Sequence, residues 1–381
     1  MSFDILCFSH LRWNFVYQRP QHLISRFGKN HRVLFFEEPE FGQYADHYTA
    51  YREHDTDVYV ITPKLNHEGM TLSNEQRIKT LLDQSLIDFS ASDFIVWYYT
   101  PMALQFSSHL EPLLIVYDCM DELSAFRNAP VKLIDMENEL FKSADVIFTG
   151  GYNLYEHKRQ KHHHIFPFPS SIDKEHFFQS RKIGIEPEDQ KNIPGPKLGF
   201  YGVIDERFDI ELLREVAERK PEWNFVLIGP VVKIDPADLP ARENIHYLGQ
   251  RTYKELPLYL SGWDIAIMPF AVNESTRFIS PTKTPEYLAG GKPVISTPIV
   301  DVARTYGEKG LVHIIGSAET FISAAESILD QTIDRTNWLK EVDTFLATLS
   351  WDDTWSNMYE IILKALMKKN YLNHEKNEAY V

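Results

Sequence analysis

Cysteine and long apolar runs are both scarce in this sequence, and each absence excludes a class of protein. Its two cysteines, Cys7 and Cys119, lie in separate apolar runs, so we expect no disulfide framework or CxxC metal site, and a reducing, cytoplasmic setting fits best. No stretch reaches the roughly 18 consecutive apolar residues of a membrane span. The first residues, MSFDILCFSH, lack the basic region of a signal peptide. Peripheral contact with the inner face of the plasma membrane needs only an exposed basic or apolar patch, which the sequence permits.

Positive charge and phosphate-binding loops are also in short supply. The chain has 39 Lys and Arg against 54 Asp and Glu, a formal net charge of −15. Such a field repels a phosphate backbone, so nucleic acid is not an expected partner. Neither GxGxxG nor GxxxxGK[ST] occurs, which excludes the phosphate-cradling loops of Rossmann dehydrogenases and P-loop NTPases.

The composition is otherwise that of an ordinary folded protein with more than one domain. The 381 residues are 44% hydrophobic and 24% charged, and this length corresponds to roughly two or three domains. Short apolar runs alternate with amphipathic helical stretches, which is typical of strands joined by crossover helices, so we expect two doubly wound α/β sheets in tandem. The predicted strands are 4–9, 32–37, 58–62, 94–99, 113–118 and 146–149 in the first sheet and 197–201, 224–228, 245–248, 265–270, 293–297 and 312–315 in the second.

A polar stretch separates the two predicted sheets. Residues 179–196 contain Pro and Gly and no sustained apolar period, so they are predicted to link an N-terminal domain, 1–178, to a C-terminal domain, 197–350. Residues 351–369 carry a broad apolar stripe at helical spacing. They are predicted to form a helix that packs on another element.

The strongest local pattern is SPTKTPEYLAGGKPVIST at 280–297. Pro285 suits the first turn of a helix that would end at the two glycines and lead into a strand. Lys283, beside the free amides of the helix N-terminus, makes an anion site suited to a diphosphate. Glu286 can accept hydrogen bonds from a ribose diol, or it can simply complement the helix dipole.

Two carboxylates lie at the carboxyl end of a predicted strand, in the string YDCMDE at 117–122. Asp118 and Asp121 would lie at the carboxyl end of a parallel strand, where open α/β sheets bind ligands. Either can orient or deprotonate an acceptor hydroxyl, or cap the turn that follows. Gly150 and Gly151 follow the next strand and either let the chain approach a cleft or form an ordinary turn.

Two further polar runs are less specific. The DxD triplet Asp55, Thr56 and Asp57 has the residue types that hold a metal and a diphosphate, but its place before a strand is more typical of a turn. The run HKRQKHHH at 157–164 can bind a metal or an anionic surface. We interpret it as the solvated end of a surface helix.

Taken in order, these motifs resemble the GT-B glycosyltransferases of the glycogen-synthase-like group, family 4, also called glycosyl transferases group 1. EYLAGGKPV, after a Pro-rich loop with a lysine, looks like the donor-binding segment of that family. WNFVYQRPQHL at 13–23 is similar to a bacterial subset found with cell-envelope polysaccharide genes, including teichuronic-acid-type transferases. Other segments that agree in order are 144–149, 169–177, 199–213 and 245–260.

The resemblance implies a GT-B fold, in which two Rossmann-like domains face a cleft and helix 351–369 returns to the N-terminal domain. In this family the C-terminal domain holds the nucleotide sugar. Arg207 and Lys283 match the residues that hold the diphosphate, and Glu286 matches the glutamate that holds the ribose. The resemblance implies further donor-binding residues. These are Gly202 in the turn after the first strand of the C-terminal domain, Thr284 beside Lys283, and Gly249, Gln250 and Arg251 in the turn that contacts the nucleobase.

The chain departs from the family in two places. The family's E-x7-E pair would put its first glutamate at Phe278, so we expect its contact with the donor sugar to be lost or supplied by Glu274. The loop after the first strand lacks the usual glycines. Its bulky residues His10, Trp13 and Arg19 are the predicted acceptor-binding set, although Trp13 can equally seal the loop.

The function that the resemblance implies is transfer of a sugar from a nucleoside diphosphate, most often UDP, to a carbohydrate or lipid-linked acceptor, with retention of configuration. Arg207 and Lys283 would stabilise the departing diphosphate, so no metal or other cofactor is expected. An inverting route with Asp118 or Asp121 as base is the mechanistic alternative. A nucleotide-sugar epimerase of the same architecture and a non-catalytic nucleotide- or carbohydrate-binding protein stay open as other functions. Only the transferase needs an acceptor to consume the donor.

Overall fold

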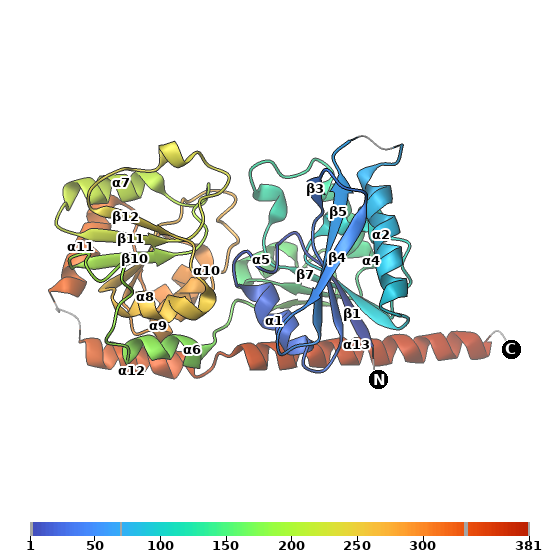
Figure 1. Cartoon of the computed structure of the whole chain (residues 1–381). Helices are drawn as coiled ribbons and strands as arrows, with labels where there is room; N and C mark the ends of the chain where they lie inside the picture. The colour runs from blue at the N-terminus through green and yellow to red at the C-terminus, as the bar shows by residue number, and fades with distance from the viewer. Residues whose placement is uncertain (1–2, 69–70, 331–333, 380–381) are drawn as a thin grey trace.

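The chain forms two sheets, each covered by helices, with the first built from its N-terminal half and the second from its C-terminal half (Figure 1). The computed structural model describes residues 3–68, 71–330 and 334–379, with side chains as far as residue 371. Among these residues the named strands pair in parallel, except for one antiparallel edge strand, β4. The predicted α/β class with two parallel sheets is confirmed.

The first sheet has nine strands in the described part of the chain, in the order β3-β5-β2-β1-β6-β7-β8-β9, and β4 pairs with β5 outside this order. Its six predicted strands are all present. Sequence reasoning missed β3, β4 and β9, because β3 and β9 are three residues long and five of the six β4 residues are exposed. The bounds are β1 Asp4–Phe8, β2 Val33–Phe36, β3 Glu40–Gly42, β4 His47–Arg52, β5 Val58–Asn66, β6 Phe94–Tyr98, β7 Leu114–Cys119, β8 Val146–Thr149 and β9 Ile165–Pro167.

The second sheet has six strands within the described ranges, in the order β12-β11-β10-β13-β14-β15. All six were predicted, because most of these strands are buried along their whole length and read as continuous apolar runs. The bounds are β10 Lys197–Tyr201, β11 Asn224–Ile228, β12 Ile245–Gly249, β13 Ile265–Met268, β14 Val294–Ser296 and β15 His313–Ile314.

Helices lie on both faces of each sheet, as the alternation of strands and helices requires. The α-helices are α1 Arg19–Phe27, α2 Asn74–Asp88, α3 Leu104–Ser107, α4 Leu133–Ser143, α5 Tyr152–Lys158, α6 Lys174–Phe178, α7 Ile210–Arg219, α8 Leu256–Ser261, α9 Lys283–Ala289, α10 Val300–Val302, α11 Ala318–Leu329, α12 Arg335–Leu346 and α13 Trp351–Ala379. Single turns of 3₁₀-helix span Pro101–Ala103, Leu123–Ala125, Gln179–Arg181, Pro236–Asp238 and Tyr253–Glu255, and a π-helical turn spans Ala303–Gly307.

The first sheet carries a separate core on each face. Alternate residues of β1 point to opposite sides, so that Ile5 lies in one cluster and Leu6 in the other. Helices α1 and α13 cover the first cluster, and α2, α4 and α5 cover the second. Both free cysteines, Cys7 and Cys119, are buried, one in each cluster.

The chain crosses between the domains twice, and the two crossings lie side by side. In the first, Ile172 and Phe177 are already buried in the core of the second domain, although the predicted N-terminal domain extended to residue 178. In the second, α13 returns to the first domain, where Met358 and Ile362 are buried against it. The amide of Trp351 donates to the carbonyl of Ile172 at 3.3 Å, which joins the two crossings directly.

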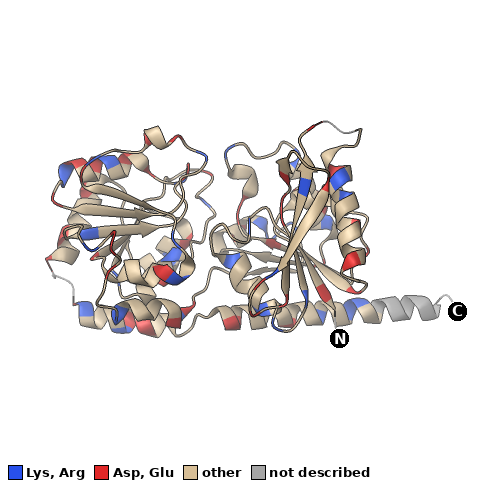
Figure 2. Ribbon diagram, viewed as in Figure 1, with Lys and Arg blue, Asp and Glu red and all other residues tan. Residues whose placement is uncertain are grey.

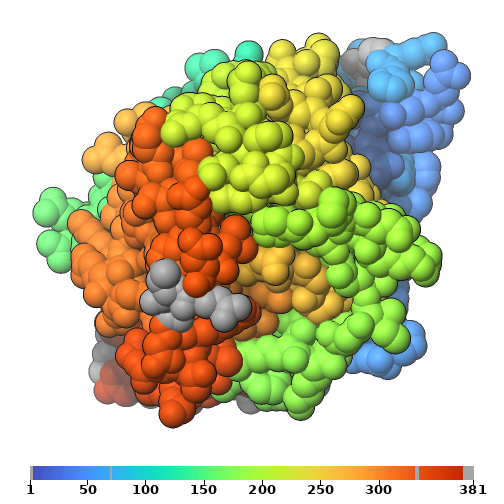
Figure 3. Space-filling view, turned by 90° about the vertical axis from the view of Figure 1, so that its left-hand side faces the viewer, coloured from blue at the N-terminus to red at the C-terminus, as the bar shows by residue number. Residues whose placement is uncertain are grey.

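The predicted linker 179–196 is packed onto the second domain rather than hanging free. Gln190 is fully buried: its amide nitrogen donates to the carbonyl of Tyr259, and its oxygen accepts from the Trp263 indole. In the space-filling view of Figure 3 this light-green segment runs over the surface of the second domain. The sequence does not show these contacts, because the linker side chains that make them are polar.

Charge and hydropathy of the elements agree with the composition. Lys and Arg are interspersed with Asp and Glu along the helices of both domains in Figure 2, with no element that is basic throughout. None of the helices in the described ranges combines the length and the apolar character that crossing a membrane requires.

Candidate active site

A cavity of about 1060 Å³ lies between the two domains, at the carboxyl ends of their parallel strands. Its walls come from the loop after β1, from the turns after β7 and β8, and from the turns after β10, β11 and β12 together with the start of α9. Ligands bind at this edge of open α/β sheets. The volume is at the upper end of the range of small-molecule sites, which leaves room for two substrates.

The start of α9 supplies the first charged group of the cavity. The predicted helix is present, with Pro285 in its first turn and Gly290 as its C-cap. Lys283 lines the cavity, and among the described residues its Nζ makes no hydrogen bond or ion pair. Burial lowers the pKa of Lys283. The ammonium group is therefore held in the wall of the cavity with its hydrogen-bond donors available to a ligand.

Gly202 makes room for Lys283. It follows β10 with φ +143°, a conformation that residues with a side chain rarely adopt. A Cβ at this position would lie 2.1 Å from Cε of Lys283. Gly202 lies in the turn after β10, and a glycine is required there both by its own backbone conformation and by the nearby lysine.

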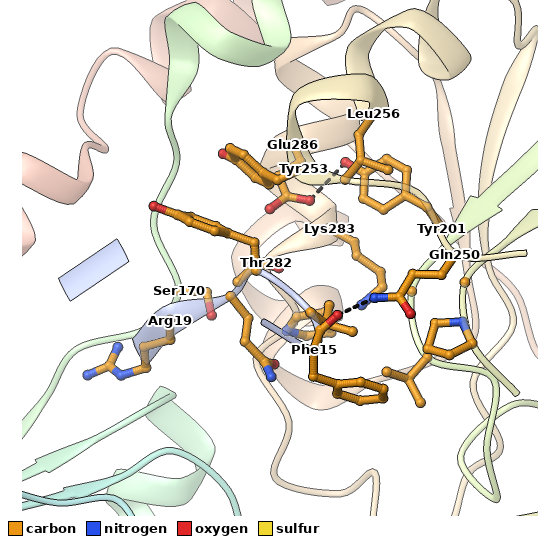
Figure 4. A pocket seen from close by; sticks show the side chains of 18 of the residues that line it. Phe15, Arg19, Ser170, Tyr201, Gln250, Tyr253, Leu256, Thr282, Lys283 and Glu286 are labelled. Carbon is orange, nitrogen blue, oxygen red and sulfur yellow. Dashed lines mark hydrogen bonds between the residues drawn. The ribbon is translucent and has the colours of Figure 1, made fainter. Parts of the chain in front are cut away.

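Glu286 lies one helical turn into α9 and also lines the cavity. Its side chain is buried, and Oε2 accepts a hydrogen bond from the hydroxyl of Tyr201 at 2.8 Å (Figure 4). Burial raises the pKa of Glu286 to about 7, against the opposing effects of the Tyr201 hydrogen bond and the Lys283 charge. The two residues that sequence reasoning singled out most strongly, Lys283 and Glu286, therefore share one wall.

Arg207 lies on the same side of the cavity, but its guanidinium is already paired. Nε donates to Oδ1 of Asp205 at 3.0 Å, and Nη2 donates to Oδ2 at 2.7 Å. The guanidinium also lies 5.2 Å from the ring centre of Phe126, a residue of the first domain. Arg207 is thus positioned from both sides and presents a net charge reduced by Asp205.

The structure separates the two candidate carboxylates. Asp118 is fully buried and does not line the cavity, because both of its oxygens accept from Arg19, at 3.0 and 2.9 Å. Arg19 reaches the cavity wall, yet its remaining Nη1 donates to the carbonyl of Phe168. Asp118 and Arg19 are therefore each other's partners rather than a free base and a free acceptor contact. Asp121 does line the cavity, and burial raises its pKa.

The predicted base-contacting turn has mixed outcomes. Gly249 has φ +72° and is not part of the cavity wall, whereas Gln250 and Arg251 are. Arg251 forms an ion pair with Asp189 and donates to the hydroxyl of Tyr259 at 2.5 Å. Gln250 donates through Nε2 to the carbonyl of Phe15 in the first domain, so this turn closes one end of the cavity (Figure 4).

Two expected donor contacts do not reach the cavity. Thr284 is buried and points into the core, where its hydroxyl lies 3.4 Å from Sδ of Met268. Glu274 is exposed and lies 3.7 Å from Arg277 on the surface, so it does not replace the missing family glutamate. Phe278 is buried in the first domain's core against His157, with ring centres 4.7 Å apart.

The predicted acceptor residues have different surroundings. Trp13 lines the cavity, but it is buried and held by hydrogen bonds from its amide to Glu37 and from its indole to Glu53. His10 does not line the cavity, and within the described residues its buried Nδ1 has no hydrogen-bond partner. Burial lowers the pKa of His10 to about 4, so the ring is neutral.

The two less specific polar runs make no site with the described residues. Asp55 lies in an exposed turn with φ 61°, which confirms the interpretation of the DxD triplet as a turn. The run 157–164 was predicted to be solvated, but one of its residues is not. Lys158 is buried between Glu122 and Glu137, each 2.7 Å from its Nζ. In the described ranges, no cluster of three or more His, Cys, Asp or Glu side chains is arranged to hold a metal ion.

A second contact between the domains lies beside Gly151. The carboxylate of Asp301, at α10, accepts hydrogen bonds from the amides of Tyr152 and Asn153 at the start of α5, at 3.0 and 2.9 Å. The side chain of Asn153 donates to the carbonyl of Arg277 at 2.7 Å. Sequence reasoning missed this contact, because Asp301 lies about 150 positions from its partners in an unremarkable helical turn.

Comparisons with known proteins agree with this architecture. The family model described as glycosyl transferases group 1 matches residues 195–331. A protein of Bacillus subtilis (strain 168), whose provisional name is teichuronic acid biosynthesis glycosyltransferase TuaH, is 26% identical over 71% of this chain and 70% of its own length.

Solved structures are similar over nearly the whole chain. Sucrose-phosphate synthase from Thermosynechococcus elongatus has a TM-score of 0.71 at 14% identity and covers 96% of this chain and 100% of its own. The E. coli structure described as trehalose-6-phosphate bound with UDP-2-fluoro glucose has a TM-score of 0.64 at 12% identity and covers 95% of this chain and 99% of its own. Starch synthase IV from Arabidopsis thaliana, bound to ADP and acarbose, has a TM-score of 0.62 at 10% identity, covering 96% and 100%. At these identities the likeness shows the fold.

Proposed function

Since the chain is a group 1 glycosyltransferase of GT-B fold, we propose that it moves a sugar from a nucleoside diphosphate, a UDP-sugar in the first instance, to a carbohydrate or lipid-linked acceptor. The observation that carries this proposal is that Lys283 and Glu286 both line the same wall of the cavity between the domains. A cation available for phosphate and a carboxylate available for a diol are the two groups that a nucleoside diphosphate requires.

In this proposal the donor lies along the second domain. Lys283 binds the diphosphate, with Arg207 as the second cation and Gly202 as the close backbone contact. Glu286 accepts hydrogen bonds from the ribose, and the base lies toward Gln250 and Arg251. Two structural relatives are bound to different nucleotides, UDP-2-fluoro glucose in one and ADP in the other. Binding measurements with different nucleotides therefore have to identify the nucleobase of the donor.

The chemistry follows from where charge develops. As the bond from the sugar to the diphosphate breaks, negative charge grows on the leaving oxygens, and Lys283 stabilises it at a fixed position in the cavity wall. We propose that the anomeric configuration is retained and that the leaving phosphate assists deprotonation of the acceptor. Asp121, which lines the cavity on the first-domain side, is then available to orient the acceptor hydroxyl. Positive side chains rather than a metal ion balance the leaving group in this scheme.

The acceptor is assigned to the first-domain wall, with Trp13 as an aromatic surface for a sugar ring. The relative named for teichuronic acid biosynthesis supports a role in cell-envelope polysaccharide synthesis. We place the reaction in the cytoplasm, at the inner face of the plasma membrane, where a lipid-linked acceptor would be reached from the water side.

Calorimetric titration with UDP, GDP and ADP in the presence of EDTA tests the donor site. We expect one nucleotide to bind selectively, and Lys283→Ala and Glu286→Ala each to weaken it by at least about tenfold. Lys364→Ala and Glu274→Ala are matched controls, because both side chains are exposed and outside the cavity. Unchanged affinity in both site variants would refute the assignment. Release of the nucleotide only when an acceptor is added distinguishes the transferase from an epimerase or a binding protein.

A further inference from the structure

Tyr201 lies where β10 meets α9, the two elements that carry the donor-binding residues. Its ring is 4% exposed and packs against the rings of Tyr287 and Trp263, with centres 4.7 and 5.8 Å away. Close packing of this kind fixes the ring orientation. The hydroxyl is therefore aimed by the core of the second domain, and it is aimed at Glu286.

The neighbouring Tyr287 joins the same two elements in a different way. Its hydroxyl accepts a hydrogen bond from the backbone amide of Tyr201 at 3.0 Å. Tyr287 thus ties helix to strand through the backbone, whereas Tyr201 contacts the carboxylate of Glu286 at 2.8 Å. Tyr287 therefore has a structural role, whereas Tyr201 contacts a residue of the site.

Burial favours the protonated form of a carboxylate, so the ionisation of Glu286 depends on the groups around it. Thr282 and Lys283 at the start of α9, and Tyr201 from β10, favour the ionised form, while Asp173 before α6 opposes it. Tyr253, from the turn after β12, also faces Glu286. Of the groups that stabilise the ionised form, Tyr201 is the one that comes from outside α9 and its N-cap, and its hydrogen bond occupies Oε2.

We propose that Tyr201 is a positioning residue for the donor, whose hydroxyl holds one oxygen of Glu286 so that the other is presented to the vicinal diol of the ribose. This inference rests on the proposed function. Of Tyr201 and Glu286, only Glu286 touches the donor in this scheme, and Tyr201 acts through it. An ionised carboxylate held in one orientation accepts from the diol without first having to reorient or lose a proton.

The test is the affinity for UDP between pH 5.5 and 8.5 in wild type, Tyr201→Phe, Tyr287→Phe and Glu286→Gln. In wild type we expect affinity to fall as the pH drops below about 7, because protonated Glu286 is a poorer acceptor. Losing the Tyr201 hydroxyl removes a contact that lowers the pKa of Glu286. In Tyr201→Phe, the decline in UDP affinity should therefore begin about one pH unit higher than in wild type. In Tyr287→Phe, the affinity should decline at the same pH as in wild type. In Glu286→Gln, only the titration of UDP itself should change the affinity with pH.

A double-mutant cycle at pH 7 separates positioning from a general structural effect. We expect Tyr201→Phe to weaken UDP binding about tenfold in wild type and to have little further effect in Glu286→Gln. Additive losses, or a Tyr201→Phe profile that superimposes on that of Tyr287→Phe, would overturn the positioning role while leaving the donor site intact. Undiminished affinity in Glu286→Gln would instead overturn the proposed donor site. Thermal unfolding of each variant confirms that the compared proteins are folded.

Discussion

The contact between Gly202 and Lys283 allows a prediction in which a single methyl group disables the site. Gly202→Ala places a Cβ 2.1 Å from Cε and 2.7 Å from Nζ of Lys283. Because these atoms are the far end of a flexible side chain, we expect the lysine to move and the backbone to stay. The ammonium group would then be displaced from the cavity wall, although no charge has been removed from the protein.

The magnitude follows from two separate effects. Loss of a charge-assisted contact costs about 1.5–3 kcal/mol of binding free energy, which corresponds to a fall in UDP affinity of about 10- to 100-fold. A φ of +143° is strained for alanine and costs about 1–3 kcal/mol of folding free energy. The first effect appears in the titration and the second in the free energy of unfolding.

Gly310 provides the control, because its φ is +70° and a Cβ there would meet nothing within 4 Å. Gly310→Ala should destabilise the protein by about 1 kcal/mol and leave UDP binding unchanged. In a Lys283→Ala background, Gly202→Ala should cause little further loss of affinity, because the group that it displaces is already absent. Wild-type affinity in Gly202→Ala would refute the reasoning. The measurements are calorimetric titration and urea unfolding.

Three further predictions concern stability. Arg19→Leu leaves Asp118 buried without its cation and should cost about 3–5 kcal/mol in urea unfolding, and replacing both residues by leucine should recover most of that loss. Asp301→Ala removes the acceptor of two backbone amides and should lower the melting temperature by a few degrees, whereas Glu274→Ala should not change it. Phe278→Ala should open a cavity at the contact between the domains and cost about 3 kcal/mol, and an unfolding free energy within 0.5 kcal/mol of wild type would contradict that burial.

The parts of the fold that could be predicted are those whose residues make local patterns. Strands such as β10 are buried on both faces and read as unbroken apolar runs, and the bounds of α9 follow from a proline at its start and glycines at its end. The edge strand β4 has no such pattern, because five of its six residues face solvent. Its place in the sheet is fixed by pairing with β5, which only the folded chain shows.

The candidate site was predictable where one segment carries the chemistry. Lys283 and Glu286 belong to one helix, so their spacing in the sequence already places them together. Asp118 was expected to face the cavity because it lies at the carboxyl end of a strand, but its direction is set by Arg19, 99 positions away. Lys158 likewise lies in a run of basic residues, while its two glutamate partners come from elsewhere in the first domain. Pairings between distant polar residues leave no local pattern to read.

The return of α13 to the first domain has a consequence for the order in which the protein is made. Met358 and Ile362 belong to the core of that domain, yet they lie in α13, which follows the second domain in the sequence. The core of the second domain contains residues from Ile172 to Leu346, all of which precede α13. During translation the second domain can therefore complete its core before the first, and the core of the N-terminal domain is completed only when α13 leaves the ribosome.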